Sequence, residues 1–197
     1  MRKSTSFPLR VKPSLFLFLF LAPMGLPPAA IAEVQTLNVD RGKSTVEVAV
    51  KATVDSFDAQ VTAFDLAIVV DGETQNVLSA QFHFTFTDLK TGDGDRDAEM
   101  YKWEGADRFP DAGFTLDSIE PATVGYTAHG RLRFHGVERS VVFPATARAE
   151  KNVLTIDGGA PLDTRDYGLP IYRRFIFFSV NPVVQVRFHL VGKLAAP

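Results

Sequence analysis

The sequence predicts an all-β protein: an antiparallel, roughly eight-stranded, lipocalin-like barrel with one short helix. Apolar and polar residues alternate in many short runs, which places every second side chain on one face of a strand. Turn sequences such as Asp71-Gly72 and Thr91-Gly92-Asp93-Gly94 separate these runs at hairpin-like intervals. Only the stretch from Asp97 to about Gly105 has the apolar spacing of a helix.

The first 32 residues have the pattern of a cleaved secretory signal. A basic stretch at 2–12 precedes an apolar run at 15–26, and Ala30-Ile31-Ala32 supplies a small-x-small cleavage site. The uninterrupted apolar part, residues 15–22, is far shorter than the ~20 residues that span a bilayer. We therefore expect a signal peptide at 1–32, a barrel domain at 33–197, a periplasmic location and no transmembrane anchor.

Charge and cysteine content exclude several function classes. The chain has 21 Lys and Arg against 23 Asp and Glu, and four of those cations lie in the first 32 residues. The barrel domain therefore carries a net charge near −6, which argues against nucleic-acid binding. With no cysteine, the chain cannot form disulfides, thiol nucleophiles, iron–sulfur clusters or thiolate zinc sites.

The alternating runs follow one another through the barrel domain, each with one polar and one apolar face. Their apolar members are Val46, Val48 and Val50; Phe64, Leu66, Ile68 and Val70; Phe82, Phe84 and Phe86; Phe114 and Leu116; Leu132 and Phe134; Leu154 and Ile156; and Val184, Val186, Phe188 and Leu190. Two segments, 141–143 and 175–178, carry apolar residues at consecutive positions. There we expect both faces of the strand to be covered.

A strand with one apolar face must bury it against another sheet or inside a closed barrel. An eight-stranded barrel is wide enough to be filled by its own side chains or to hold one small apolar ligand. Composition leaves both interiors open, because Phe side chains alone could fill the space. An outer-membrane barrel fits less well, since Phe lies in the middle of the runs and not in girdles near their ends.

One acidic cluster has the spacing of a calcium-binding loop. Asp93, Asp95, Asp97 and Glu104 would occupy positions one, three, five and twelve. Ala98 stands at position six, where such a loop needs glycine for its sharp turn. We therefore favour a solvated turn in which an arginine neutralises neighbouring carboxylates, and we expect no metal site.

The other polar residues show no catalytic pattern. The four histidines form no helical pair, and three of them lie on predicted outward faces, so we expect surface histidines: His83, His129, His135 and His189. The chain has no Gly-x-Ser-x-Gly elbow and no glycine-rich phosphate loop. We expect neither catalytic residues nor a cofactor.

Five fragments, in this order, resemble the YceI-like proteins. They are Ser44-Thr45-Val46-Glu47-Val48; Leu89-Lys90-Thr91-Gly92 followed by Arg96-Asp97; Arg108-Phe109-Pro110 with Phe114; His129-Gly130-Arg131-Leu132 with Phe134-His135-Gly136-Val137; and Arg165-Asp166-Tyr167-Gly168-Leu169. The resemblance implies an exported, lipocalin-like barrel that encloses a long isoprenoid or related lipid chain, without enzymatic activity. Glu99 replaces the histidine that the family most often has after Arg-Asp-x, which implies a different contact to the ligand head group.

We therefore expect a non-catalytic periplasmic protein that carries or sequesters a polyisoprenoid or isoprenoid-quinone-like amphiphile, as a monomer or a homodimer. The residues expected to line its cavity are Phe64, Leu66, Phe82, Phe84, Phe86, Phe114, Leu132, Phe134, Val186 and Phe188. Arg96 is expected mainly to brace the adjacent loop, with head-group contact as the alternative. Two rival functions stay open: a solid-barrel stress or interaction protein whose acidic loop 93–111 binds a partner, and an enzyme or accessory protein of isoprenoid-quinone metabolism.

Overall fold

The computed structural model describes residues 34–175 and 177–194, so the predicted signal peptide lies outside the described residues. The elements in chain order are β1 (Val34–Val39), β2 (Thr45–Val50), β3 (Phe57–Val61), β4 (Asp65–Asp71), β5 (Val77–Thr85), the 3-10 turn η1 (Phe86–Asp88), β6 (Leu89–Lys90), α1 (Gly94–Glu104), β7 (Asp111–Pro121), β8 (Tyr126–Phe134), β9 (Val137–Glu150), β10 (Val153–Asp163), the 3-10 turn η2 (Thr164–Tyr167), β11 (Arg173–Arg174), β12 (Phe178–Ser179) and β13 (Val183–Leu194).

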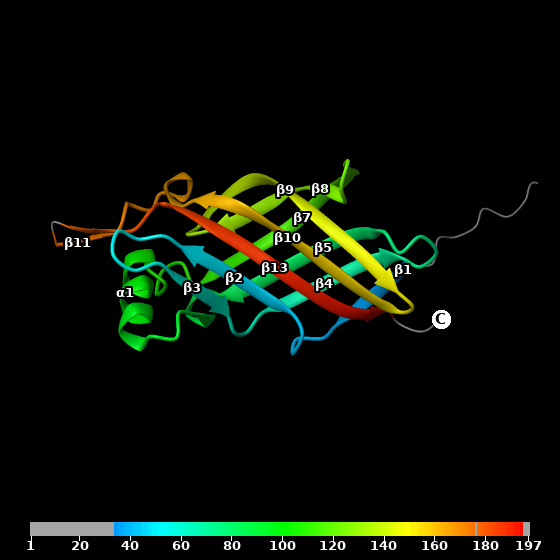
Figure 1. Cartoon of the computed structure of the whole chain (residues 1–197), viewed down its shortest axis with the longest axis horizontal. Coiled ribbons are helices and arrows are strands. Elements are labelled where there is room, and N and C mark those ends of the chain that lie inside the picture. The colour runs from blue at the N-terminus through cyan, green and yellow to red at the C-terminus, as the bar shows by residue number, and fades with distance from the viewer. Residues whose placement is uncertain (1–33, 176, 195–197) are drawn as a thin grey trace, which may run out of the picture. The chain divides into compact units, whose positions relative to one another are not determined.

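The strands form a closed antiparallel barrel (Figure 1). Eight positions around the barrel, which we call walls, are each occupied by one long strand or by two shorter ones. Three walls consist of two consecutive strands that follow one another along the same position: β1 with β2, β3 with β4, and β5 with β6. The strands β7, β8, β9 and β10 continue the meander. Strand β13 pairs with β10 on one side and with both β1 and β2 on the other. These pairings close the barrel, which has eight walls among the described residues. The predicted fold class is confirmed.

Alternate residues point into the barrel, as the sequence pattern predicts. On β13, Val184 and Leu190 are buried, while Gln185 and Arg187 between them are exposed. A bulge after Leu116 on β7 shifts the register of its pairing with β8. Such a bulge adds one residue and reverses the alternation. Ile119, three residues after Leu116, therefore points inward again.

Two expectations about covered strands are wrong. On β9, Phe143 is buried but Val142 is 58% exposed, so this strand has one wet face like the others. Phe175 and Phe177 lie at the tip of a short ribbon formed by β11 and β12, and both are exposed. The β11 region extends past the end of the barrel beside α1 (Figure 1), where no other described strand or helix covers these two side chains.

The helix α1 begins three residues before the predicted start, because Asp93 caps it. The Asp93 carboxylate accepts hydrogen bonds from the backbone N–H groups of Asp95 and Arg96. Such a cap satisfies N–H groups that have no partner within the helix. The helix ends at Gly105, which adopts φ of 76° and donates its N–H to the carbonyl of Tyr101.

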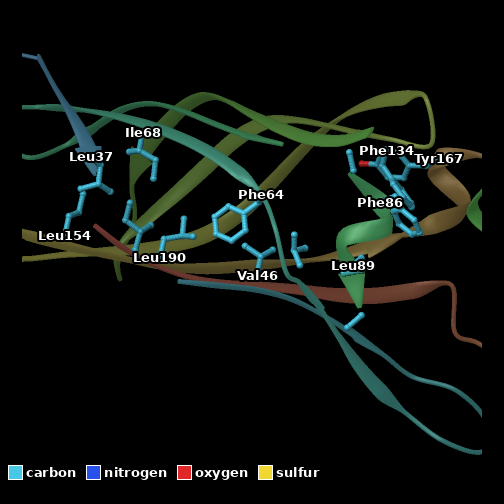
Figure 2. Packing of buried hydrophobic residues seen from close by; sticks show 14 of the residues in the cluster. Leu37, Val46, Phe64, Ile68, Phe86, Leu89, Phe134, Leu154, Tyr167 and Leu190 are labelled. Carbon is cyan, nitrogen blue, oxygen red and sulfur yellow. The ribbon is translucent and has the colours of Figure 1, made fainter. Parts of the chain in front are cut away.

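Buried side chains pack at both ends of the barrel (Figure 2). One group consists of Leu37, Ile68, Leu154 and Leu190, and the other contains Phe86, Phe134 and Tyr167. In the second group the Phe134 ring lies 5.7 Å from Phe86 and 5.5 Å from Tyr167. Burial raises the pKa of Tyr167 to about 12. The fragment at 165–169 thus supplies an aromatic side chain to this end of the barrel.

Candidate functional site

The barrel encloses a cavity of about 770 Å³. This volume falls in the range of about 300–1,000 Å³ that is typical of small-molecule pockets. Inward-facing residues of all eight walls line it, and most of them are Val, Leu, Ile, Ala or Phe. The interior is therefore hollow and apolar, and is not filled by the protein's own side chains.

Nine of the ten residues predicted to line a cavity do line it: Leu66, Phe82, Phe84, Phe86, Phe114, Leu132, Phe134, Val186 and Phe188. Phe64 lies outside the lining and packs its ring 5.5 Å from that of Phe82. The guanidinium of Arg41 lies 5.8 Å from the Phe64 ring centre. Contact of these side chains with a ligand stays a prediction.

Several small lining residues were missed by the sequence analysis. Ala145 and Ala147 on β9 and Ala160 on β10 border the cavity. Ala145 and Ala147 are two residues apart, as residues on one face of a strand are, but alanine is a weak marker of an apolar face. Gly130 and Gly158 also matter, because a Cβ at either position would overlap an aromatic ring of the cavity wall.

Polar lining residues gather at the two ends of the cavity. At one end lie Gln75, Asn76, Tyr126 and Thr146. At the other end, beside α1, lie Asp55, Asp93, Asp95, Arg96, Glu99, Tyr172, Arg174 and Asn181, and we call this end the α1 mouth. Strand β5 runs from the first group toward α1, and its nine residues span roughly 30 Å. The site is an apolar tube with polar ends.

A family model for the YceI-like domain matches residues 37–192, almost the whole described barrel. The chain belongs to the YceI-like family. A comparison with curated proteins found no match.

Solved structures share this YceI-like fold. BcnA of Burkholderia cenocepacia is 25% identical, with a TM-score of 0.70 over 78% of this chain and 99% of that one. A polyisoprenoid-binding domain from Saccharophagus degradans, implicated in plant cell wall breakdown, is 16% identical, with a TM-score of 0.58 over 83% and 100%. The YceI protein of Campylobacter jejuni is 13% identical, with a TM-score of 0.56 over 72% and 85%. The last two likenesses concern the fold alone.

Arg96 braces the α1 mouth. Its Nη2 lies 3.5 Å from a carboxylate oxygen of Asp55 and 3.8 Å from one of Asp93. Its guanidinium also lies 4.5 Å from the ring centre of Phe57. These contacts connect the start of α1 to the segment between β2 and β3. Arg96 also lines the cavity, so contact with a ligand head group stays a prediction.

Glu99, the departure from the usual YceI-like pattern, lines the same mouth. The hydroxyl of Tyr172 donates a hydrogen bond to Glu99 Oε2 at 3.1 Å. Partial burial, and then this hydrogen bond, raise the pKa of Tyr172. The family's usual histidine is thus replaced by a carboxylate that is tied to the segment leading into β11.

The acidic residues of the predicted calcium-like spacing do not come together. Asp93 caps α1, and Asp97 Oδ1 accepts hydrogen bonds from the N–H and the hydroxyl of Thr91. Glu104 lies at the far end of α1, buried in the protein. No group of three or more His, Asp or Glu side chains within the described residues is arranged to hold a metal ion.

His135 is not the outward-facing strand residue that we expected. It lies in the turn between β8 and β9 with φ of 48°, and its ring centre is 4.2 Å from that of Phe109. Its Nδ1 lies 3.4 Å from Oε1 of Glu104, which is 1% exposed. Burial raises the pKa of Glu104, while the contact with His135 offsets part of that rise.

No helix in the part of the chain that the structure describes is long and apolar enough to cross a membrane.

Proposed function

We propose that this YceI-like protein binds one long apolar amphiphile, a polyisoprenoid or an isoprenoid quinone, inside its barrel and carries or sequesters it. The observation that carries this proposal is the cavity, which is apolar along its length and polar only at its ends. Burial of an apolar chain gains about 25 cal/mol per Å² removed from water. A linear tail fits a tube of this kind better than a wide, rigid ring system does.

The polar groups of the α1 mouth support an orientation in which the ligand's head group lies at this end of the cavity. Arg96 offers guanidinium donors, while Glu99 and Tyr172 offer a carboxylate and a hydroxyl. A head group with a hydroxyl, carbonyl or phosphate oxygen could pair with these groups while its tail extends toward Gln75. The description of the S. degradans neighbour as a polyisoprenoid-binding domain is consistent with this ligand class.

We also propose that the protein does not react with its ligand and releases it chemically unchanged. Polar lining groups lie at the ends of the cavity, so the middle of a bound tail would meet apolar side chains. At the mouth, Arg96 is engaged by Asp55 and Asp93, and Glu99 by Tyr172. Chromatography of the extracted ligand after prolonged incubation with the protein is expected to show the starting compound alone. A new product would favour the enzyme alternative.

The proposed location is the periplasm, and it rests on the predicted signal at 1–32. N-terminal sequencing of the protein recovered from a periplasmic fraction is expected to begin at Glu33. Recovery of the uncut chain from the cytoplasm would overturn this location.

Trp103 gives a direct readout of binding, since it is the single tryptophan of the chain and lines the cavity near its α1 end. Titration with a polyprenol is expected to change its fluorescence and to saturate at one ligand per protein. Ala160→Phe, which fills part of the cavity, should weaken uptake at least about tenfold. Thr155→Phe, an outward position on the same strand β10, should bind as the natural protein does.

Thermal unfolding of both variants keeps this test interpretable, because overpacking costs about 1–3 kcal/mol. If Ala160→Phe does not fold, Ala147→Phe on β9 fills another part of the same cavity. A folded filling variant that binds polyprenol with unchanged affinity would contradict the proposed function.

A further inference from the structure

Two exposed phenylalanines project from the end of the barrel. Phe175 is 75% and Phe177 is 72% exposed, and their rings stack with centres 6.3 Å apart. We call this pair the aromatic tip. It lies at the turn between β11 and β12, in the region that extends past the barrel end beside α1 (Figure 1). Large apolar side chains that are grouped and exposed commonly mark an interaction site.

The ribbon that carries the aromatic tip is anchored to the barrel. Arg173 pairs with Ser179 across the ribbon. The carbonyl of Ser179 accepts hydrogen bonds from the backbone N–H and the hydroxyl of Thr53, both at 3.0 Å. The N–H of Val180 donates to the carbonyl of Tyr172 at 3.0 Å. The barrel therefore holds the two rings in an outward position.

The aromatic tip borders the opening of the cavity. Phe175, Phe177 and Arg174 all belong to the cavity lining at the α1 mouth. Apolar surface thus continues from the interior of the barrel to the tip. A ligand tail that leaves the cavity through this mouth would pass along the tip without crossing a purely polar rim.

The charges around the tip fit a phosphate-bearing surface. Arg173 and Arg174 flank it in a barrel domain with a net charge near −6, and both are exposed. The guanidinium of Arg174 lies 5.5 Å from the ring centre of Phe175. Four acidic residues also line the mouth: Asp55 and Asp93 are paired with Arg96, Glu99 accepts a hydrogen bond from Tyr172, and Asp95 lies in the first turn of α1. Cationic groups beside exposed aromatic rings are typical of segments that bind the surface of an anionic bilayer.

We propose that the aromatic tip docks the barrel onto a phospholipid bilayer that contains anionic lipid. Phe175 and Phe177 enter the boundary between head groups and acyl chains, and Arg173 and Arg174 contact the phosphates. The purpose of this docking rests on the proposed function, because it would let an amphiphile pass between bilayer and cavity through the α1 mouth. The docking itself needs no ligand and is measured without one.

Vesicle flotation with the ligand-free exported protein tests the docking. The vesicles are phosphatidylcholine alone, or equal parts of phosphatidylcholine and phosphatidylglycerol. The protein is expected to float with the mixed vesicles, less with phosphatidylcholine alone, and less at high salt. Phe175→Ser with Phe177→Ser should reduce binding at least about tenfold. Val142→Ser, which removes an exposed apolar side chain from the wall strand β9, should leave it unchanged.

Arg173→Glu separates charge from apolar insertion, since Arg173 is exposed and outside the cavity lining. It should weaken binding to the mixed vesicles about fivefold or more, with little effect on phosphatidylcholine alone. Its uptake of polyprenol in vesicle-free solution should match that of the natural protein.

Three results would overturn the docking proposal. One is failure of the natural protein to float with either vesicle, and another is flotation of the double serine variant at the natural level. The third is that the natural protein sediments as a dimer, the double serine variant sediments as a monomer, and neither binds vesicles. That result would make the tip a contact between two copies of the chain. Vesicle binding without polyprenol uptake would refute the proposed function alone, and the reverse pattern would refute the docking alone.

Discussion

Gly158 shows how one residue shapes the cavity. It lies on β10 opposite Phe188 of β13, and the Phe188 ring occupies the space that a Cβ at Gly158 would need. The ring can therefore lie against the barrel wall without pointing into the lumen. Gly130 likewise leaves room for the Phe114 ring, which occupies the space that a Cβ at Gly130 would need. The hollow interior depends on glycine beneath aromatic rings as much as on the rings themselves.

Gly158→Ala is expected to push the Phe188 ring into the cavity. Such overpacking should lower the free energy of unfolding by about 1–3 kcal/mol and weaken polyprenol uptake. Gly94→Ala is the matched control, because a Cβ at that position, the first residue of α1, meets open space. Urea unfolding measures both variants, and equal stability of the two would refute this account of the cavity wall.

Glu104 is the second residue whose surroundings predict a measurable effect. It is buried at the C-terminal end of α1, faces His135, and has Asp107 nearby. Burial raises its pKa in the folded protein above the ordinary value. The folded state then binds the proton more tightly than the unfolded state does. This contribution to stability is full below the ordinary pKa and is lost as the pH rises through the raised pKa.

Glu104→Gln should therefore gain in melting temperature relative to the natural protein as the pH rises from about 4 to about 8. The glutamine stays neutral throughout, so it does not undergo the ionisation that destabilises the folded state. Glu150→Gln, at the exposed end of β9, serves as the control and should follow the natural protein. Melting curves for Glu104→Gln that stay parallel to those of the natural protein over this range would contradict the predicted sign.

At the scale of elements, strands were predictable because each wall has one face exposed to solvent and one apolar face toward the barrel interior. The run on β13 carries this signal at almost every position. Bulges were not predictable, since a single extra residue after Leu116 changes which later side chains face inward. The exposure of Phe175 and Phe177 was also missed, because the apolar pattern of that segment resembles that of a covered strand.

The start of α1 was misplaced for a related reason. Asp93 and its acidic neighbours have the spacing of a metal loop, and this obscured the role of Asp93 as a helix cap. Whether a carboxylate caps a helix depends on where the chain turns after β6, and sequence spacing does not specify that turn. Glu104 likewise gave no sign of burial, since its partner His135 lies 31 residues away, in the turn between β8 and β9.

Removing this cap gives a prediction for the element. Asp93→Ala should cost about 1 kcal/mol of stability, because two N–H groups of α1 lose their acceptor. Asp93→Asn keeps a side-chain oxygen and should lose much less. Chemical denaturation measures both variants. If asparagine destabilises the protein as much as alanine does, the effect arises from the lost contact with Arg96 and not from capping.

At the scale of the whole molecule, the barrel is closed by its first and last strands. Leu37 pairs with Leu194 and Val39 with Gly192, so the meander has no free edge between β1 and β13. Packed side chains at both ends support the walls around the cavity (Figure 2). This closure holds an apolar interior open without any disulfide.

The closed barrel could be predicted from alternation, but the hollow interior could not. Alternation specifies which face is dry and says nothing of the volume left inside. That volume depends on small residues: Ala145 and Ala160 border the lumen on adjacent strands, and Gly158 makes room for the Phe188 ring. The order of the family fragments pointed to a lipid-holding barrel, whereas the residue pattern alone left a filled barrel equally open.

The central claim is that the cavity holds one long apolar amphiphile. Native mass spectrometry of the protein released gently from a bacterial periplasm, followed by organic extraction, tests it most directly. We expect the mass of the chain from Glu33 plus one isoprenoid-class molecule that the extraction recovers intact. A bare chain that stays bare after incubation with both a polyprenol and an isoprenoid quinone would contradict the claim.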